Sequence, residues 1–234
     1  MANKSTKDDF SKYVKWFWIL VLGGVLSLFL AVGLAAVGAF GKLPTFEEIE
    51  TPKSNLASQI ITSDGKMMGK FYLENRTHSD YEELSPHLIN ALVATEDERF
   101  YQHSGIDFEA LARAIFKLGR DGGGSTITQQ LAKQLFHKPP QTLVGRVVQK
   151  LKEWVISAKL ERQYTKEEII AMYFNQFDFL YQAVGVNSAA RIYFNTTPDS
   201  LTIEQSAILV GMAKNPSYYN PKRDTTRMKN RRNV

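Results

Sequence analysis

An uninterrupted apolar segment near the N-terminus most constrains how this chain folds. Residues 16–40 carry no charged side chain, and their single polar side chain is that of Ser27. As a helix they would extend about 37 Å, which exceeds the hydrocarbon core of a bilayer at about 30 Å. Because they are apolar on every face, a buried core helix is a poor alternative. We therefore expect one uncleaved transmembrane helix over residues 16–40.

The residues before this segment predict its orientation. Lys4, Lys7, Lys12 and Lys15 outnumber two aspartates there. By the positive-inside rule, residues 1–15 form a cytoplasmic tail and the rest of the chain is exported. A cleaved signal peptide is the alternative, but its apolar core usually has only about 7–15 residues.

Composition excludes several kinds of chemistry. The 234 residues include no cysteine, which excludes disulfides, thiolate metal sites and cysteine nucleophiles. They include only four histidines, which disfavours a metal site built from histidines. A net charge of +5 suits an anionic partner, such as nucleic acid, anionic lipid or pyrophosphate. Nucleic acid is disfavoured, because no basic stripe is interleaved with aromatic residues and an exported domain would not meet it.

The exported part is predicted to be a linker, a hairpin and then helices. Residues 41–57 are polar and include two prolines, as expected of a linker. The segments 59–62 and 66–71 flank Asp64-Gly65, which favours a β-hairpin turn. Everything after Ser85 is expected to be helices and loops.

Helix starts are marked by capping patterns. Ser85-Pro86 places a capping serine before a proline at the first helical position. Thr165 and Thr202 are each followed three residues later by Glu or Gln, which is the capping-box pattern. Apolar residues recur at helical spacing from Val144 to Ala158, which predicts a long amphipathic helix.

Glu96 is the candidate general base. At helical spacing it shares a face with Leu92, Val93 and Phe100. A carboxylate on an apolar face is costly unless it is paired or used, and an enclosed carboxylate suits proton transfer. The alternative is a frayed last turn in which Glu96 is simply solvated.

A glycine-rich segment precedes another predicted helix. Residues 122–124 are glycines, and Ser125-Thr126 leads into the helical run 127–133. Free N–H groups and the helix dipole favour an anion there, and Thr126 and Lys133 would add a hydroxyl and a charge. A flexible loop before an ordinary capped helix is the alternative. The pattern lacks the Lys-Ser or Lys-Thr of a nucleotide P-loop.

The long helix carries polar residues at matched spacing. Arg146, Lys150 and Glu153 follow one another at four and three residues, on the side opposite the apolar stripe. A solvated face with one ion pair is the simplest interpretation.

Taken together, five ordered motifs resemble those of the peptidoglycan glycosyltransferases. Residues 96–105 match the family pattern E-D-x-x-F-x-x-H-x-G, and residues 123–133 match its second motif. The remaining matches are Lys150-x-x-Glu153, residues 166–175, and residues 189–194 with Pro216 and Pro221 downstream. The chain is similar to the glycosyltransferase part of class A penicillin-binding proteins.

Three positions depart from the family pattern. Gln149 stands where the third motif has Arg, Ala171 where the fourth has Glu, and Gln134 where the second ends in Asn. Gln149 removes a cation expected near the pyrophosphate, and Arg146 one turn earlier is our candidate substitute. No Ser-x-x-Lys motif of a transpeptidase is present in these residues.

The resemblance implies a mainly α-helical, lysozyme-like glycosyltransferase domain over residues 58–221, with the small N-terminal β-hairpin, preceded by one transmembrane helix. Residues 222–234 would begin a C-terminal connection that is cut short. The implied reaction polymerises lipid II into peptidoglycan by inverting transfer and releases undecaprenyl pyrophosphate. The implied location is the cytoplasmic (inner) membrane, crossed once, with the catalytic domain on the extracytoplasmic, periplasmic face.

The resemblance also implies the site and its partners. Glu96 would be the base, and Glu153 would orient basic side chains or help hold a divalent cation (Mg or Mn). Lipid II, the growing glycan chain, membrane lipid and other cell-wall synthesis proteins are the implied partners. An apolar stretch from Ile106 to Phe116 would dip into the membrane interface. The implied substrate-binding residues are Asp97, Phe100, His103, Ser125, Thr126, Gln130, Lys133, Arg146 and Lys150.

Two alternative functions stay open from the residues alone. A lysozyme-like hydrolase would also use one glutamate, but it has no pyrophosphate to neutralise with Lys133 and Lys150. An inactive, membrane-anchored glycan-binding scaffold would explain the substitutions at Gln149 and Ala171.

Overall fold

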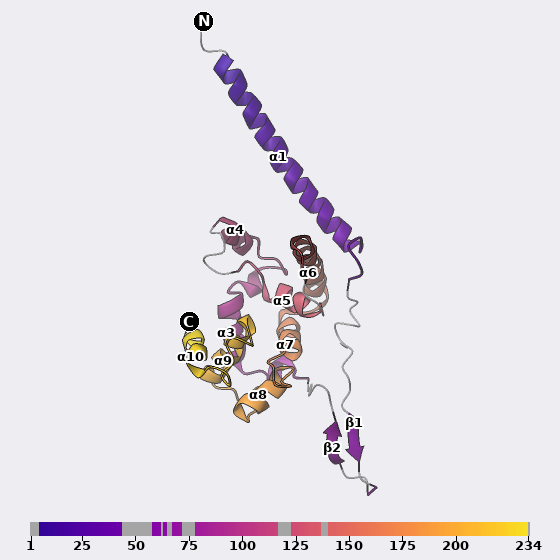
Figure 1. Ribbon diagram of the computed structural model, residues 1–234, viewed down its shortest axis with the longest axis vertical. Helices are drawn as coiled ribbons and strands as arrows, with labels where there is room; N and C mark the ends of the chain where they lie inside the picture. Colours follow the sequence, from indigo (N-terminus) through magenta and orange to yellow (C-terminus); the bar gives the residue numbers. More distant parts are fainter. Residues whose placement is uncertain are drawn as a thin grey trace. The chain divides into compact units, whose positions relative to one another are not determined.

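The computed structural model describes residues 5–43, 58–61, 63–64, 67–71, 78–116, 123–136 and 140–233. Most of these residues are helical, as predicted (Figure 1). The chain divides into two compact units, which are described separately. The first comprises residues 1–43 and 139–155, and the second comprises residues 44–138 and 156–234.

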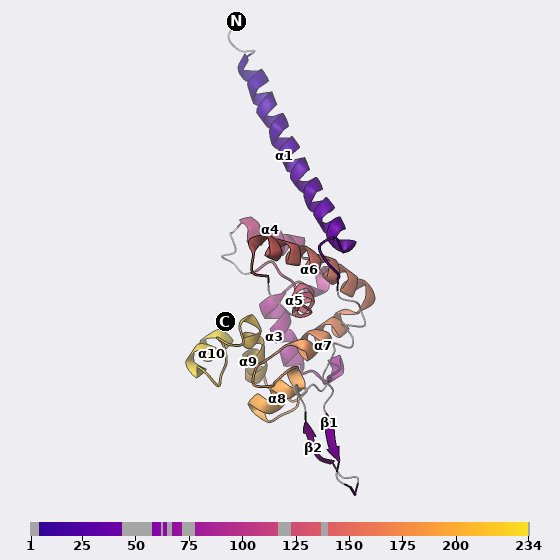
Figure 2. The ribbon, with the colours of Figure 1, turned by 45° about the vertical axis from the view of Figure 1, so that its right-hand side comes forward.

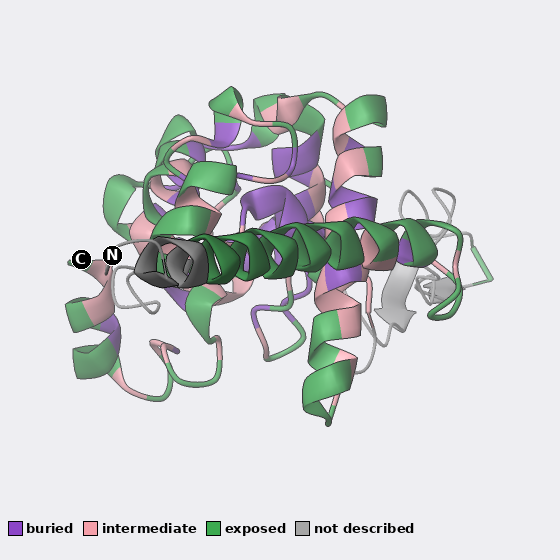
Figure 3. Cartoon of the chain, turned by 90° about the horizontal axis from the view of Figure 1, so that it is seen from above, coloured by how far each residue is buried: buried purple, intermediate pink, exposed green. Residues whose placement is uncertain are grey.

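The first unit contains the apolar N-terminal helix. Helix α1 spans Ser5–Ala36, and within it Ser11–Ala36 is long and apolar enough to cross a membrane, the one such helix among the described residues. Its residues are exposed along most of the helix (Figure 3). The helix ends four residues before the predicted Phe40, because turns at Gly38 and Gly41 adopt positive φ angles of 79° and 104°. Residues 5–15 of the predicted cytoplasmic tail are helical and continuous with the apolar segment.

The first unit also contains the beginning of the long predicted helix. Helix α6 spans Leu143–Gln163, and its residues up to Val155 belong to this unit. Ala35 of α1 is buried with Leu151 and Val155 of α6. The predicted long helix is confirmed, but at the start of its apolar stripe Val144 and Val147 are 74% and 61% exposed. Only the part of the stripe that meets α1 within this unit is covered.

The second unit begins with the predicted hairpin. Strands β1, Ser58–Ile61, and β2, Met67–Phe71, pair antiparallel. Gln59 lies opposite Lys70 and Ile61 opposite Met67, with an irregularity between Ile60 and Ile61. Gly65 of the predicted turn lies outside the described residues.

Helices build the rest of the second unit. Helix α3 packs against α9, α5 against α7, and α10 against α9 (Figure 2). The largest fully buried side chains include Tyr173, Phe100, Phe174 and Phe179. The elements are η1 Tyr81–Glu83, α3 Pro86–Glu96, η2 Phe100–Gln102, α4 Phe108–Phe116, α5 Ile127–Gln134, α7 Lys166–Gln176, α8 Val186–Phe194, α9 Ile203–Lys214 and α10 Thr225–Arg232.

The predicted helix starts are confirmed. Ser85 Oγ accepts a hydrogen bond from the backbone N–H of His87 at the start of α3. Thr165 and Thr202 begin α7 and α9 with complete capping boxes. These local signals fix the direction in which each helix leaves its loop.

The C-terminal residues are part of the packed unit. Residues 225–232, which the sequence analysis assigned to a connection after the domain, form α10. Asp224 caps this helix by accepting from the N–H of Arg227, and Met228 is buried against α9 at Gly211. The absence of Cβ at Gly211 matters, because a Cβ there would lie 2.6 Å from Cε of Met228.

Candidate active site

Glu96 is the last residue of α3, and its side chain is enclosed. Its Oε2 accepts a 2.8 Å hydrogen bond from Nε2 of Gln130, and its Oε1 lies 3.8 Å from Nη2 of Arg231. The side chain is 16% exposed. It is therefore held by partners from α5 and α10, in contrast to the solvated side chain of a frayed turn.

Gln130 is oriented by a second contact. Its Oε1 accepts a 3.3 Å hydrogen bond from the hydroxyl of Tyr173. Tyr173 is buried on α7, and burial raises the pKa of its phenol, so the hydroxyl remains a donor. With its amide oxygen facing a donor, Gln130 must turn its N–H₂ group toward Glu96.

Asp97 ties the end of α3 to the start of α5. One of its oxygens accepts a 3.0 Å hydrogen bond from the backbone N–H of Ile127. Nε2 of His103 lies 3.0 Å from both oxygens of the same carboxylate. Asp97 is 8% exposed, so these contacts satisfy a buried charge.

The glycine-rich loop is held in place by its neighbours. Thr126 caps α5 by accepting from the N–H of Gln129, and its hydroxyl donates to the carbonyl oxygen of Gly105 at 2.7 Å. A Cβ at Gly124 would lie 3.1 Å from Cα of Leu111, so the loop can only approach α4 this closely as glycine. The predicted substrate-binding hydroxyl of Thr126 is buried and already used within the protein.

A cavity of about 320 Å³ lies between these elements. Its lining includes Glu96, Arg99, Arg113, Gly124, Ser125 and Gln130. With Asp97, Glu98 and Asp107 also in its lining, the cavity combines four carboxylates, two arginines and the backbone of the loop before α5. Lys133 is exposed on the last turn of α5, and it does not line this cavity.

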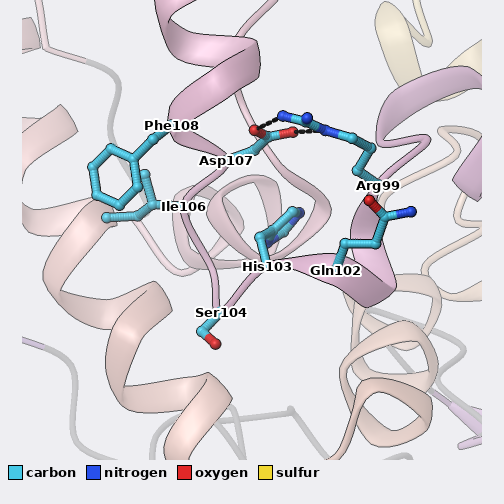
Figure 4. A pocket seen from close by; sticks show the side chains of 7 residues that line it. All are labelled: Arg99, Gln102, His103, Ser104, Ile106, Asp107 and Phe108. Carbon is cyan, nitrogen blue, oxygen red and sulfur yellow. Dashed lines mark hydrogen bonds and ion pairs between the residues drawn. The ribbon is translucent and has the colours of Figure 1, made fainter.

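A second cavity, of about 450 Å³, is lined by side chains between Arg99 and Phe108 (Figure 4). Arg99 binds the carboxylate of Asp107 through Nε at 3.0 Å and through Nη2, and it also pairs with Glu109. Burial acts to raise the pKa of Asp107, but the hydrogen bonds from Arg99 and from the N–H of Ala110 outweigh it and hold the pKa below its ordinary value. This pair fixes the loop that carries His103.

Phe100 is fully buried behind the candidate base. Nζ of Lys166 lies 4.2 Å from the centre of its ring and donates to the carbonyl oxygen of His103. Phe100 and His103 therefore support the loop from inside the protein, and the assigned contact with substrate stays a prediction for both.

In the first unit, Glu153 lies with two of its helix neighbours on α6. Its Oε1 accepts a 2.9 Å hydrogen bond from Nε2 of Gln149, and its Oε2 lies 3.2 Å from Nζ of Lys150. Glu153 is 5% exposed, so the expected solvated face is here a buried carboxylate with an ion pair. Arg146, the proposed substitute for the missing cation, is exposed.

Among the described residues, one group of side chains has the spacing to hold a metal ion. Donor atoms of Asp97, His103 and Asp107 lie within 4.8 Å of one another. However, His103 already faces Asp97, and the Arg99 guanidinium already neutralises Asp107. Because a divalent cation would have to displace these contacts, the residues fit a structural cluster better than a metal centre.

Sequence reasoning missed three side chains of the site. Arg113 lies on α4, Tyr173 on α7 and Arg231 on α10, and each comes from outside the glutamate and glycine motifs. The helical spacing of α4 and α7 gave no signal that Arg113 lines the cavity of Glu96 or that Tyr173 contacts Gln130. Tyr173 was noted only as a motif position.

Comparisons with known proteins agree with these features. A family model described as "Transglycosylase" matches residues 64–234. Penicillin-binding protein 1A of Escherichia coli is 34% identical over 95% of this chain, and the protein of the same name from Aquifex aeolicus is 35% identical over 92%. Penicillin-binding protein 1F of Bacillus subtilis is 36% identical over 76%. The chain spans between 25% and 30% of the length of these relatives.

Proposed function

The chain belongs to the transglycosylase family, and from that premise we propose that it is a peptidoglycan glycosyltransferase that polymerises lipid II into glycan strands. The lipid-linked growing chain is the donor and lipid II is the acceptor. The 4-hydroxyl of the acceptor attacks the anomeric carbon of the donor, and undecaprenyl pyrophosphate leaves.

The observation that carries this proposal is the enclosed carboxylate of Glu96 in a cavity that Arg113 also lines. Attack by a hydroxyl requires a base, and Glu96 lies in the cavity, 16% exposed. The departing pyrophosphate develops negative charge, which cations and backbone N–H groups stabilise without a proton donor. Arg113 and the loop at Gly124 supply such groups beside Glu96.

Helix α6 supplies further cationic groups. Lys150 is paired with the buried Glu153, which limits the directions in which its ammonium group can point. From the motif pattern alone, we assign Lys150, Arg146 and Lys133 to binding of the pyrophosphate. Glu153 acts by holding Lys150 and Gln149, and we derive no step through a divalent cation, because its oxygens are already paired.

The lipid tails of donor and acceptor require a membrane. Helix α1 supplies an anchor of sufficient length, and Phe108 and Phe116 of α4 are 70% and 86% exposed. Aromatic residues exposed on one helix suit the interface between headgroups and acyl chains. We place the domain on the extracytoplasmic face of the cytoplasmic membrane, where other proteins of cell-wall synthesis are its expected partners.

The test is incubation of the purified chain in detergent with labelled lipid II, with glycan length read on a gel. We expect lipid-linked polymers from the wild type and almost none from Glu96→Gln. Cleavage of preformed glycan without polymerisation would favour the hydrolase instead. Binding of glycan without any turnover would favour the inactive scaffold.

A further inference from the structure

The carboxylate of Glu96 has a different partner on each oxygen. Gln130 donates to Oε2 at 2.8 Å, while Nη2 of Arg231 lies 3.8 Å from Oε1. Arg231 is only 13% exposed. One oxygen therefore meets a neutral amide, and the other meets a cation that comes from the C-terminal helix, 135 residues later in the chain.

Helix packing brings Arg231 to this place. Helix α3, which ends at Glu96, packs against α9, and α9 packs against α10 (Figure 2). Gly211 of α9 allows the close approach, because a Cβ there would lie 2.6 Å from Cε of Met228 and 3.3 Å from Cγ of Arg231. The side chain of Arg231 is thus directed along α9 toward the end of α3.

A purely structural side chain would not need this charge. Nε of Arg231 is buried and has no hydrogen-bond partner among the described residues. A buried cation with an unused donor costs free energy that an apolar side chain of the same length would avoid. Besides Glu96, the guanidinium lies near the ring of Tyr219, whose centre is 5.9 Å from Cζ. The ion pair with Glu96 is therefore the interaction that accounts for an arginine here.

We propose that Arg231 is a positioning residue that holds the carboxylate of Glu96 in the orientation needed for proton transfer. The proposal rests on the proposed function. In the reaction, the acceptor oxygen forms its bond to the anomeric carbon and its proton passes to Glu96. The bond to the pyrophosphate oxygen breaks, and its electron pair leaves with the pyrophosphate. At 3.8 Å, Arg231 does not occupy a lone pair of Oε1, so that oxygen can still accept the hydroxyl.

The first measurement is steady-state glycan synthesis by Arg231→Met, which keeps the aliphatic packing on Gly211. Because Arg231 acts through Glu96 and not on the substrate, we expect kcat to fall about tenfold, equivalent to about 1.4 kcal/mol, while KM for lipid II stays near the wild-type value. Arg231→Lys keeps the charge and should retain most of kcat. Added guanidinium chloride at low concentration should partly restore Arg231→Met.

Arg227→Met is the matched control. Arg227 lies on α10 one turn before Arg231, is 42% exposed, and contacts Asp224 and Tyr218 instead of the site. It should keep both the wild-type kcat and the wild-type KM. Gly211→Ala displaces Met228 and Arg231 without changing either, and should lower kcat in the same direction as Arg231→Met.

A readout that needs no turnover separates this proposal from the proposed function. In protein labelled with ¹³C at glutamate carboxyl carbons, the resonance of Glu96 is identified by its loss in Glu96→Gln. We expect it to shift in Arg231→Met and to stay in place in Arg231→Lys and Arg227→Met. An unmoved resonance, or equal loss of kcat in the methionine and lysine variants, would overturn the role of Arg231. A shifted resonance in a wild type that makes no glycan would overturn the proposed function and leave the ion pair established.

Discussion

Oδ2 of Asp97 accepts a 3.0 Å hydrogen bond from the backbone N–H of Ile127, the first residue of α5. The N-terminus of α5 is therefore occupied by a carboxylate of the protein itself, at the place where the sequence suggested an anion from outside. Helix α5 carries Gln130, and Asp97 directly follows Glu96. The contact thus fixes the candidate base and its amide partner relative to each other.

We expect Asp97→Asn to lower both stability and turnover. The substitution removes the charge that interacts with the dipole of α5 and with His103, which should cost about 1–2 kcal/mol of unfolding free energy. Chemical unfolding and single-turnover rates measure the two effects. Asp80→Asn, at the exposed cap of η1 beside the exposed His78, is the control and should change neither, because asparagine can still cap.

Asp107 gives a prediction on acid stability. The pKa of Asp107 is lower in the folded state than the value of about 3.9 in the unfolded chain. Its ion pair with Arg99 therefore stabilises the fold fully at pH values above the unfolded pKa. This stabilisation is lost as the pH falls through the lower, folded-state pKa. Unfolding free energy should therefore drop on acidification below about pH 4. Asp107→Asn should be less stable near neutral pH and should lack that part of the drop.

Arg99→Met tests the same relationship from the other partner. It should reduce stability near neutral pH and flatten the acid profile in the same way. If Asp107→Asn and the wild type kept parallel profiles down to about pH 2, the lowered pKa of Asp107 would be contradicted.

Local signals in the sequence predicted local structure well. The capping residues Ser85, Thr165 and Thr202 begin helices as expected, because a cap needs only its own first turn. Helical spacing placed Glu96 on an apolar face but left open whether it is solvated, and the structure shows it 16% exposed. Arg231 did not, because its approach to Glu96 depends on how α10 packs on α9 at Gly211, which no spacing in α10 indicates.

At the start of α6, the apolar period did not predict which residues are buried. Val144 and Val147 fit the apolar period as well as Leu151 and Val155 do, yet only the latter pair is buried. Periodicity predicts which residues share a face, but a neighbouring segment decides whether that face is covered. Within the first unit, Ala35 of α1 covers Leu151 and Val155.

Deletions of two lengths should separate anchoring from packing. Removing residues 1–28 takes away most of the apolar helix but keeps Ala31, Val32 and Ala35, which pack near Leu151 and Val155. Removing residues 1–43 also exposes Leu151 and Val155, which should cost a further ~1–3 kcal/mol of stability. Both proteins should bind liposomes more weakly than the full chain, as measured by co-sedimentation. Equal binding by all three would contradict a single anchor.

We expect Gln149→Arg to raise turnover. Gln149 donates to Oε1 of Glu153, and an arginine can keep this contact while adding the cation expected at the start of the third motif. A gain of about 1 kcal/mol in stabilisation of the leaving group corresponds to roughly fivefold in rate. Gln163→Arg, at the exposed end of the same helix, adds the same charge and should have no effect.

Arg146→Ala completes this test as a double-mutant cycle. If Arg146 substitutes for the missing cation, its removal should slow the wild type more than it slows Gln149→Arg. Equal losses in the two backgrounds would show that Arg146 acts independently of position 149.

The two carboxylates should differ in what their loss removes. Glu96→Gln keeps the shape of the side chain and can still accept from Gln130, but it has no base, so the single-turnover rate should fall by about 10²–10⁴ while a donor analogue still binds. Glu153→Gln leaves Lys150 without its charged partner on α6, so the ammonium group is less well oriented.

Glu153→Gln should therefore weaken binding of the donor analogue as well as the rate. Lys150→Met is the comparison, because it removes the cation itself and should weaken donor binding at least as much. Affinity for the donor analogue and the single-turnover rate are measured on all three variants. A base acts on the transition state, whereas a positioning carboxylate already acts on the bound donor. Near-normal turnover in Glu96→Gln would therefore reverse the two assignments. Loss of donor binding in Glu96→Gln, with unchanged donor binding in Glu153→Gln, would reverse them too.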